Sequence, residues 1–123
     1  IGLVSPLVKK LFDRGSPFPL PGDNSFPSGH GMATMAIAAV VVVLVWRTRW
    51  SVIASVGMAV FALAIGAAVI ADGGHWLSDV IAGWCLAIVW TTAVCLVVSR
   101  RAGGEPVGAY LRARSGLRLG TAG

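Results

Sequence analysis

The chain contains two histidines, His30 and His75, and each stands beside residues that would let an imidazole do chemistry. Asp79 follows His75 by four residues, a spacing that places both side chains on one face of a helix. A carboxylate there can accept a hydrogen bond from one ring nitrogen and leave the other bare, as a nucleophile or base. Alternatively, Asp79 caps a helix and His75 is merely solvated in the preceding loop. This motif alone leaves both interpretations open.

The other histidine ends the segment Pro27-Ser28-Gly29-His30, which opens a long apolar run. Proline and serine suit the cap region of a helix, and glycine allows a close approach to the backbone. Free N–H groups at a helix start, with the helix dipole behind them, form an anion site. The hydroxyl of Ser28 and the imidazole of His30 would face the same anion. The alternative is an ordinary helix cap with an interfacial histidine.

A metal site is a third interpretation of these polar residues. His30, His75, Asp72 and Asp79 are suitable ligand types, but their spacing matches no recognised ligand motif. We therefore expect neither a metal nor a cofactor.

The composition indicates a membrane protein. Apolar residues make up 56% of the chain, charged residues only 12%, and the mean hydropathy is +0.81, which is too apolar for a small soluble domain. Three uncharged apolar runs are long enough to cross a bilayer. They predict an all-α fold, an integral membrane helical bundle of about three transmembrane helices at residues 30–46, 51–71 and 79–99.

These helices define a core at residues 27–100 with a different segment on each side. Residues 1–26 are rich in proline and glycine and predict an interfacial amphipathic segment and loop. Residues 101–123 predict a poorly ordered, cytoplasmic basic tail. Because three helices cannot easily enclose both histidines, we expect helices upstream of Ile1, or a second copy in a homo-oligomer, to complete the bundle.

The basic residues predict the orientation of the bundle. The net charge is +5, but no basic face interleaved with aromatic side chains is present, so we expect no nucleic-acid partner. Seven of the ten lysines and arginines fall on the side away from the histidines: Arg47, Arg49, Arg100, Arg101, Arg112, Arg114 and Arg118. The richer side should be cytoplasmic. The histidines would then be on the extracytoplasmic face of a plasma or inner membrane.

Together the two histidine motifs resemble the type 2 phosphatidic acid phosphatase family, which is related to the vanadium haloperoxidases. The family pattern is a lysine, six residues and Arg-Pro, then PSGH, then Ser-Arg, five residues, a histidine, three residues and an aspartate. PSGH is intact at residues 27–30, and His75 with Asp79 fits the last block. The resemblance covers roughly residues 5–100, and in the family further helices precede this part.

The resemblance implies a membrane phosphatase acting on a lipid phosphate, such as phosphatidate, phosphatidylglycerophosphate or a polyprenyl phosphate or diphosphate. His75 would be the nucleophile that takes the phosphoryl group as a phosphohistidine. Asp79 would orient His75, and His30 would protonate the leaving alcohol. The bilayer and the lipid phosphate would be the partners, and no metal would be required.

Further residues would bind the phosphate by the same resemblance. Ser28 and Gly29 match the family's oxygen-holding positions, and Lys9 occupies the lysine position of the first motif. Both motif arginines are missing, because Ser16 and Val69 stand where they are expected. Arg14, two residues from Ser16, could partly replace the first.

The missing arginines also motivate a different function. Arginine binds phosphate oxygens bidentately, so the loss of two such contacts would slow turnover strongly. The alternative is a catalytically impaired relative that binds a phospholipid or serves as a membrane partner.

Overall fold

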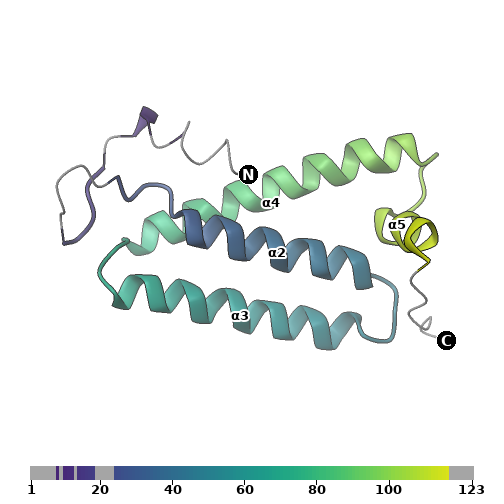
Figure 1. The fold of residues 1–123 in the computed structure, drawn as a ribbon, viewed down its shortest axis with the longest axis horizontal. Coiled ribbons are helices and arrows are strands. Elements are labelled where there is room, and N and C mark those ends of the chain that lie inside the picture. Colours follow the sequence, from purple (N-terminus) through teal and green to yellow (C-terminus); the bar gives the residue numbers. More distant parts are fainter. Residues whose placement is uncertain (1–7, 9, 13, 19–23, 117–123) are drawn as a thin grey trace.

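The described part of the chain is all-helical. The computed structural model describes residues 8, 10–12, 14–18 and 24–116, and within these it has four helices and no strand (Figure 1). The helices are α2 (Gly29–Val45), α3 (Ser51–Ala71), α4 (Leu77–Arg101) and α5 (Val107–Ser115). The prediction of an all-α fold is confirmed for these residues.

Two helices are long and apolar enough to cross a membrane, namely α3 and α4, whereas α2 is apolar but only 17 residues long. Only 11% of the apolar window of α3 and 22% of that of α4 is buried. Core helices of a soluble protein would be mostly buried, so the exposure of α3 and α4 suggests contact with lipid or with further helices. The count of about three spans stays a prediction.

The helix α2 is the centre of the bundle. It packs against both α3 and α4, which contact each other far less (Figure 1). The buried cluster consists of Met32 and Ala36 of α2 and Ala87 of α4, with Met35 and Leu86 partly buried beside it. Small residues in such a contact let two helix backbones approach closely, which is how helices associate in lipid.

The closest approach lies near the start of α2 and α4 and depends on Gly83. A Cβ atom on Gly83 would lie 2.7 Å from the carbonyl oxygen of Ser28 and 3.0 Å from the backbone nitrogen of Met32. Because these neighbours are backbone atoms, no side-chain rotation would relieve the clash. The glycine therefore sets how near α4 lies to the beginning of α2.

The C-terminal segment differs from the expectation. The prediction of a poorly ordered tail is wrong for residues 107–115, which form α5. Gly108 lies against the carbonyl of Val43, and Nη1 of Arg112 donates hydrogen bonds to the carbonyls of Leu44 and Trp46. The last carbonyls of a helix have no partner within it and carry the negative end of its dipole. Arg112 thus caps the C-terminal end of α2, a tertiary contact that composition does not reveal.

Candidate active site

The beginnings of α2 and α4 meet at one end of the bundle. The N–H of Ser28, the cap residue of α2, donates a 3.0 Å hydrogen bond to the carbonyl of Asp79 in the first turn of α4. His30 is in the first turn of α2, and His75 lies just before α4. Both histidines therefore belong to the same end of the molecule.

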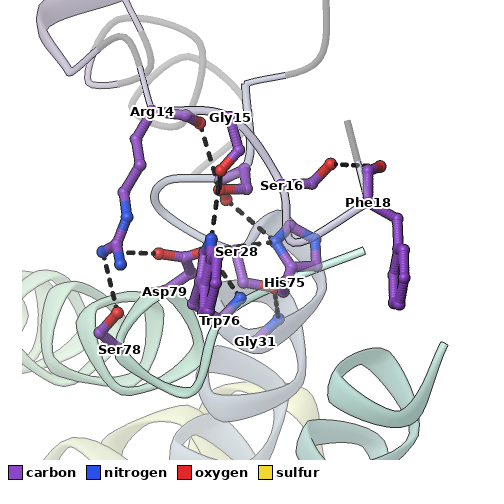
Figure 2. Close-up of polar contacts among 11 residues, drawn as sticks. Arg14, Gly15, Ser16, Phe18, Ser28, Gly31, His75, Trp76, Ser78 and Asp79 are labelled. Carbon is purple, nitrogen blue, oxygen red and sulfur yellow. Dashed lines mark hydrogen bonds and ion pairs between the residues drawn. The ribbon is translucent and has the colours of Figure 1, made fainter. Parts of the chain in front are cut away.

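The imidazole of His75 is held by a backbone carbonyl. Its Nδ1 lies 2.9 Å from the carbonyl oxygen of Ser25, and its side chain is only 15% exposed (Figure 2). Since a carbonyl can only accept, Nδ1 carries the proton in this contact, and Nε2 has no hydrogen-bond partner among the described residues. In the neutral form, a ring with this tautomer has its lone pair on Nε2, which is the state that a nucleophile needs.

The spacing of His75 and Asp79 predicts that the Asp79 carboxylate accepts this hydrogen bond. Its Oδ2 lies 4.0 Å from Nδ1 of His75, which is beyond hydrogen-bond range. Instead, Oδ2 accepts the N–H of Trp76 at 2.9 Å, so the carboxylate caps the start of α4. The capping role considered as the alternative is thus the one that the geometry gives to Asp79.

Arg14 supplies the counter-charge for Asp79. The carboxylate is fully buried, and its Oδ1 lies 3.3 Å from Nη1 of Arg14. The same nitrogen donates to Oγ of Ser78 at 2.9 Å, and the guanidinium lies 5.7 Å from the centre of the Trp76 ring. Nη2 and Nε of this half-exposed guanidinium have no acceptor among the described residues, so Arg14 keeps donors for an anion.

The loop before α2 is tied to the start of α4. The N–H of Ser25 donates to the carbonyl of Arg14 at 2.8 Å, and its hydroxyl lies 3.2 Å from the carbonyls of both Arg14 and Gly15. Nε1 of Trp76 donates to the carbonyl of Gly15 at 3.2 Å. Figure 2 shows Arg14, Gly15 and Ser16 of this loop beside His75, Trp76 and Asp79.

The start of α2 has the features of an anion site. Ser28 is fully buried, and its Oγ accepts the N–H of Gly31 at 3.2 Å, which is the expected cap. The N–H groups of Gly29 and His30 have no acceptor within the described ranges, as usual for a first turn. The His30 side chain is exposed, and within those ranges its ring has no polar contact. These donors are therefore free for a ligand.

The positions of the two missing arginines are filled without charge. Ser16 is buried and donates its hydroxyl to the carbonyl of Phe18 at 2.9 Å, and Val69 lies half-buried near the end of α3. Lys9, the remaining predicted phosphate ligand, lies outside the described residues. Groups of three or more His, Cys, Asp or Glu side chains that could hold a metal do not occur in the described part of the chain.

Sequence reasoning missed Ser25. Its carbonyl contacts His75, and its hydroxyl donates to the backbone carbonyl of Arg14. Neither interaction requires a residue spacing such as the one that identified His75 and Asp79. In the sequence, only its position two residues before Pro27 of the PSGH motif suggested that Ser25 lies near the site.

Comparison with known proteins agrees with the motifs. The model of the PAP2 superfamily matches residues 4–102, which is most of the 123-residue chain and includes both histidine blocks. Neither the curated proteins nor the solved structures give a significant match. Members of the PAP2 superfamily typically hydrolyse phosphate esters. The match over this length shows that the chain belongs to the PAP2 superfamily, that of the type 2 phosphatidic acid phosphatases.

Proposed function

We propose that this protein is a membrane phosphatase that hydrolyses a lipid phosphate through a phosphohistidine on His75. The observation that carries the proposal is the 2.9 Å contact between Nδ1 of His75 and the carbonyl of Ser25, because it leaves Nε2 as the nucleophilic atom. The substrate is a phosphatidate, a phosphatidylglycerophosphate, or a polyprenyl phosphate or diphosphate.

The reaction proceeds in two displacements at phosphorus. Nε2 of His75 attacks, the bond between phosphorus and the lipid oxygen breaks, and His30 donates a proton to that oxygen. Water then attacks the phosphohistidine, His30 takes the water proton, and inorganic phosphate leaves as the bond to Nε2 breaks. Proton transfer of this kind contributes about 10²- to 10⁴-fold to a rate.

The charge that develops on the transferring group is met by donors that are already in place. The free N–H groups of Gly29 and His30 stand at the positive end of the α2 dipole. Arg14 offers the guanidinium nitrogens that do not bond to Asp79 or Ser78. By the family pattern, Lys9 would be a further phosphate ligand. Asp79 acts indirectly: it does not contact the phosphate, and it positions Arg14 and the start of α4.

A membrane location fits both the family and the apolar helices. The exposed apolar surfaces of α3 and α4 suit contact with acyl chains or with further helices, and a lipid substrate would reach the histidine end from the bilayer. We assign the histidine end to the extracytoplasmic face because most arginines lie at the other ends of the helices, away from the histidines. Further helices or a second copy of the chain would complete the enclosure of the site.

Phosphate release from defined lipids tests the proposal. The full-length protein in detergent micelles is expected to release phosphate from at least one of the three lipid classes, and His75→Ala to abolish release. His75→Gln, which nearly conserves side-chain volume, serves as the control for packing. Release that persists in both variants would remove His75 from the reaction.

The alternative of an impaired relative rests on Ser16 and Val69, which bring no cation to the site. In that case the same donors bind a phospholipid headgroup without turnover. Binding of the lipid with no release by the unmodified protein would favour this alternative.

A further inference from the structure

We propose that Ser25 is the positioning residue of His75: its carbonyl fixes the imidazole as the Nδ1–H tautomer, and its hydroxyl fixes that carbonyl. This inference deepens the proposed function, because it names what prepares the nucleophile of that same site. It assigns to a backbone group the orienting role that a carboxylate was expected to have.

The contact is specific for one tautomer. A carbonyl oxygen has no proton to give, so the 2.9 Å contact forms only when Nδ1 of His75 is protonated. The neutral ring must then carry its lone pair on Nε2. A solvated imidazole is free to place its proton on either nitrogen, so the Ser25 carbonyl selects the reactive form before substrate arrives.

The carbonyl is itself held in place by its own residue. Ser25 is 1% exposed, and its N–H donates to the carbonyl of Arg14 at 2.8 Å. Its hydroxyl lies 3.2 Å from the carbonyls of both Arg14 and Gly15. These contacts anchor Ser25 to the segment of Arg14 and Gly15, so the hydroxyl helps to hold the loop that places the carbonyl beside His75.

Asp79 is not available for the same task. Its Oδ2 accepts the N–H of Trp76, and its Oδ1 faces Arg14. Both oxygens are therefore engaged in holding the start of α4 and the guanidinium. The two functions are separated: Asp79 fixes the cation, and Ser25 fixes the imidazole.

Ser25 also links these two functions. Its bonds to the Arg14 carbonyl hold the backbone of the residue whose side chain reaches Ser78 and Asp79. A disturbance at Ser25 is therefore expected to loosen the nucleophile and the cation together, although Ser25 itself would not contact the phosphate.

Nitrogen NMR reads the tautomer directly. The chain has two histidines, so ¹⁵N-histidine labelling reports both imidazoles, and the variants His30→Gln and His75→Gln assign their resonances. We expect His75 to show a protonated Nδ1 and a bare Nε2. His30 is exposed and without a described partner, so its ring serves as the internal reference for a solvated imidazole.

Substitution at Ser25 tests the hydroxyl. Ser25→Ala should give His75 a mixture of tautomers and lower kcat up to about tenfold, the size of one lost hydrogen bond, with KM changed less than twofold. Ser25→Thr keeps the hydroxyl and should restore both readouts. Ser99→Ala is the matched control, because it removes a hydroxyl bonded to the Leu96 carbonyl at 3.0 Å near the other end of α4. Ser99→Ala should change neither the His75 tautomer nor kcat.

The NMR and activity results together test the inference and distinguish its failure from that of the proposed function. A His75 ring protonated on Nε2 in the unmodified protein would overturn the inference, and so would Ser25→Ala with an unchanged tautomer. If Ser25→Ala does not fold, the tautomer of His75 in the unmodified protein still decides whether the Ser25 carbonyl orients the ring. A protonated Nδ1 together with phosphate release that survives His75→Ala would support the positioning by Ser25 and refute the proposed function.

Discussion

The N–H of Ser28 lies 3.0 Å from the carbonyl oxygen of Asp79, so the cap of α2 is bonded directly to the first turn of α4. Two segments far apart in the sequence thereby place their helix beginnings together. The positive ends of two helix dipoles then face the same region, which favours an anion there. The contact joins the PSGH motif to the motif of His75 and Asp79.

A side chain at Gly83 should disrupt this junction. In Gly83→Ala the new Cβ would lie 2.7 Å from the Ser28 carbonyl, so α4 must move away from α2. We expect a loss of about 1–3 kcal/mol in unfolding free energy, as for other overpacked contacts, and reduced phosphate release. Thermal unfolding in detergent measures the first effect.

Gly57→Ala is the control for Gly83→Ala. A Cβ on Gly57, in the exposed part of α3, would meet no atom within 4 Å. Alanine also favours a helix more than glycine does, so this variant should be as stable as the parent or more so. Equal stability of the two variants would show that the α2–α4 contact is looser than described.

The loss of rate in His30→Ala should depend on the leaving group of the substrate. An alkyl alcohol needs a proton as it departs, whereas an acidic phenol does not. We therefore expect His30→Ala to slow release from a lipid phosphate about 100-fold and release from an aryl phosphate less than tenfold. His75→Ala should abolish both. Equal losses with both substrates in His30→Ala would assign His30 to binding rather than proton transfer.

Restoring the two family arginines should raise turnover. In the variant Ser16→Arg with Val69→Arg, each guanidinium adds hydrogen bonds to phosphate worth about 1.5–3 kcal/mol, so kcat/KM should rise at least tenfold. Ser16→Lys with Val69→Lys is the control for charge without the bidentate geometry. A folded arginine variant with no gain would indicate a pocket that serves another purpose.

Loss of Arg112 should release α5 from α2. Cys95 lines an apolar cavity of about 190 Å³ together with Val107 and Leu111 of α5. Without the guanidinium at the Leu44 carbonyl, the Cys95 thiol should react faster with a membrane-permeant maleimide, and Cys85, exposed on the same helix, provides the reference rate. Arg114→Ala is the matched control, since within the described part of the chain Arg114 bonds to Tyr110 of its own helix at 2.8 Å and to no other residue. An unchanged rate of maleimide reaction at Cys95 in Arg112→Ala would show that Arg112 does not hold α5 against α2.

Much of the fold could be predicted from the sequence, because uncharged apolar runs determine helices over long stretches. The three runs that predicted helices at residues 30–46, 51–71 and 79–99 agree closely with α2, α3 and α4. The cap at Ser28 could also be predicted, since serine before an apolar run accepts a first-turn N–H.

The remaining features could not be predicted because backbone groups make them. The partner of His75 is a carbonyl on Ser25, and a carbonyl belongs to every residue type. Asp79 was identified by its spacing, but spacing could not show that Trp76 and Arg14 occupy its carboxylate. The helix α5 depends on Arg112 reaching the end of α2, a contact between segments that composition does not relate.

The most direct test of the central claim is a structure of the full-length protein with vanadate, which imitates phosphate in transfer. We expect vanadium bonded to Nε2 of His75, with vanadate oxygens accepting the N–H groups of Gly29 and His30. Vanadate bound elsewhere, or held with Nε2 of His75 turned away from it, would refute the phosphohistidine mechanism.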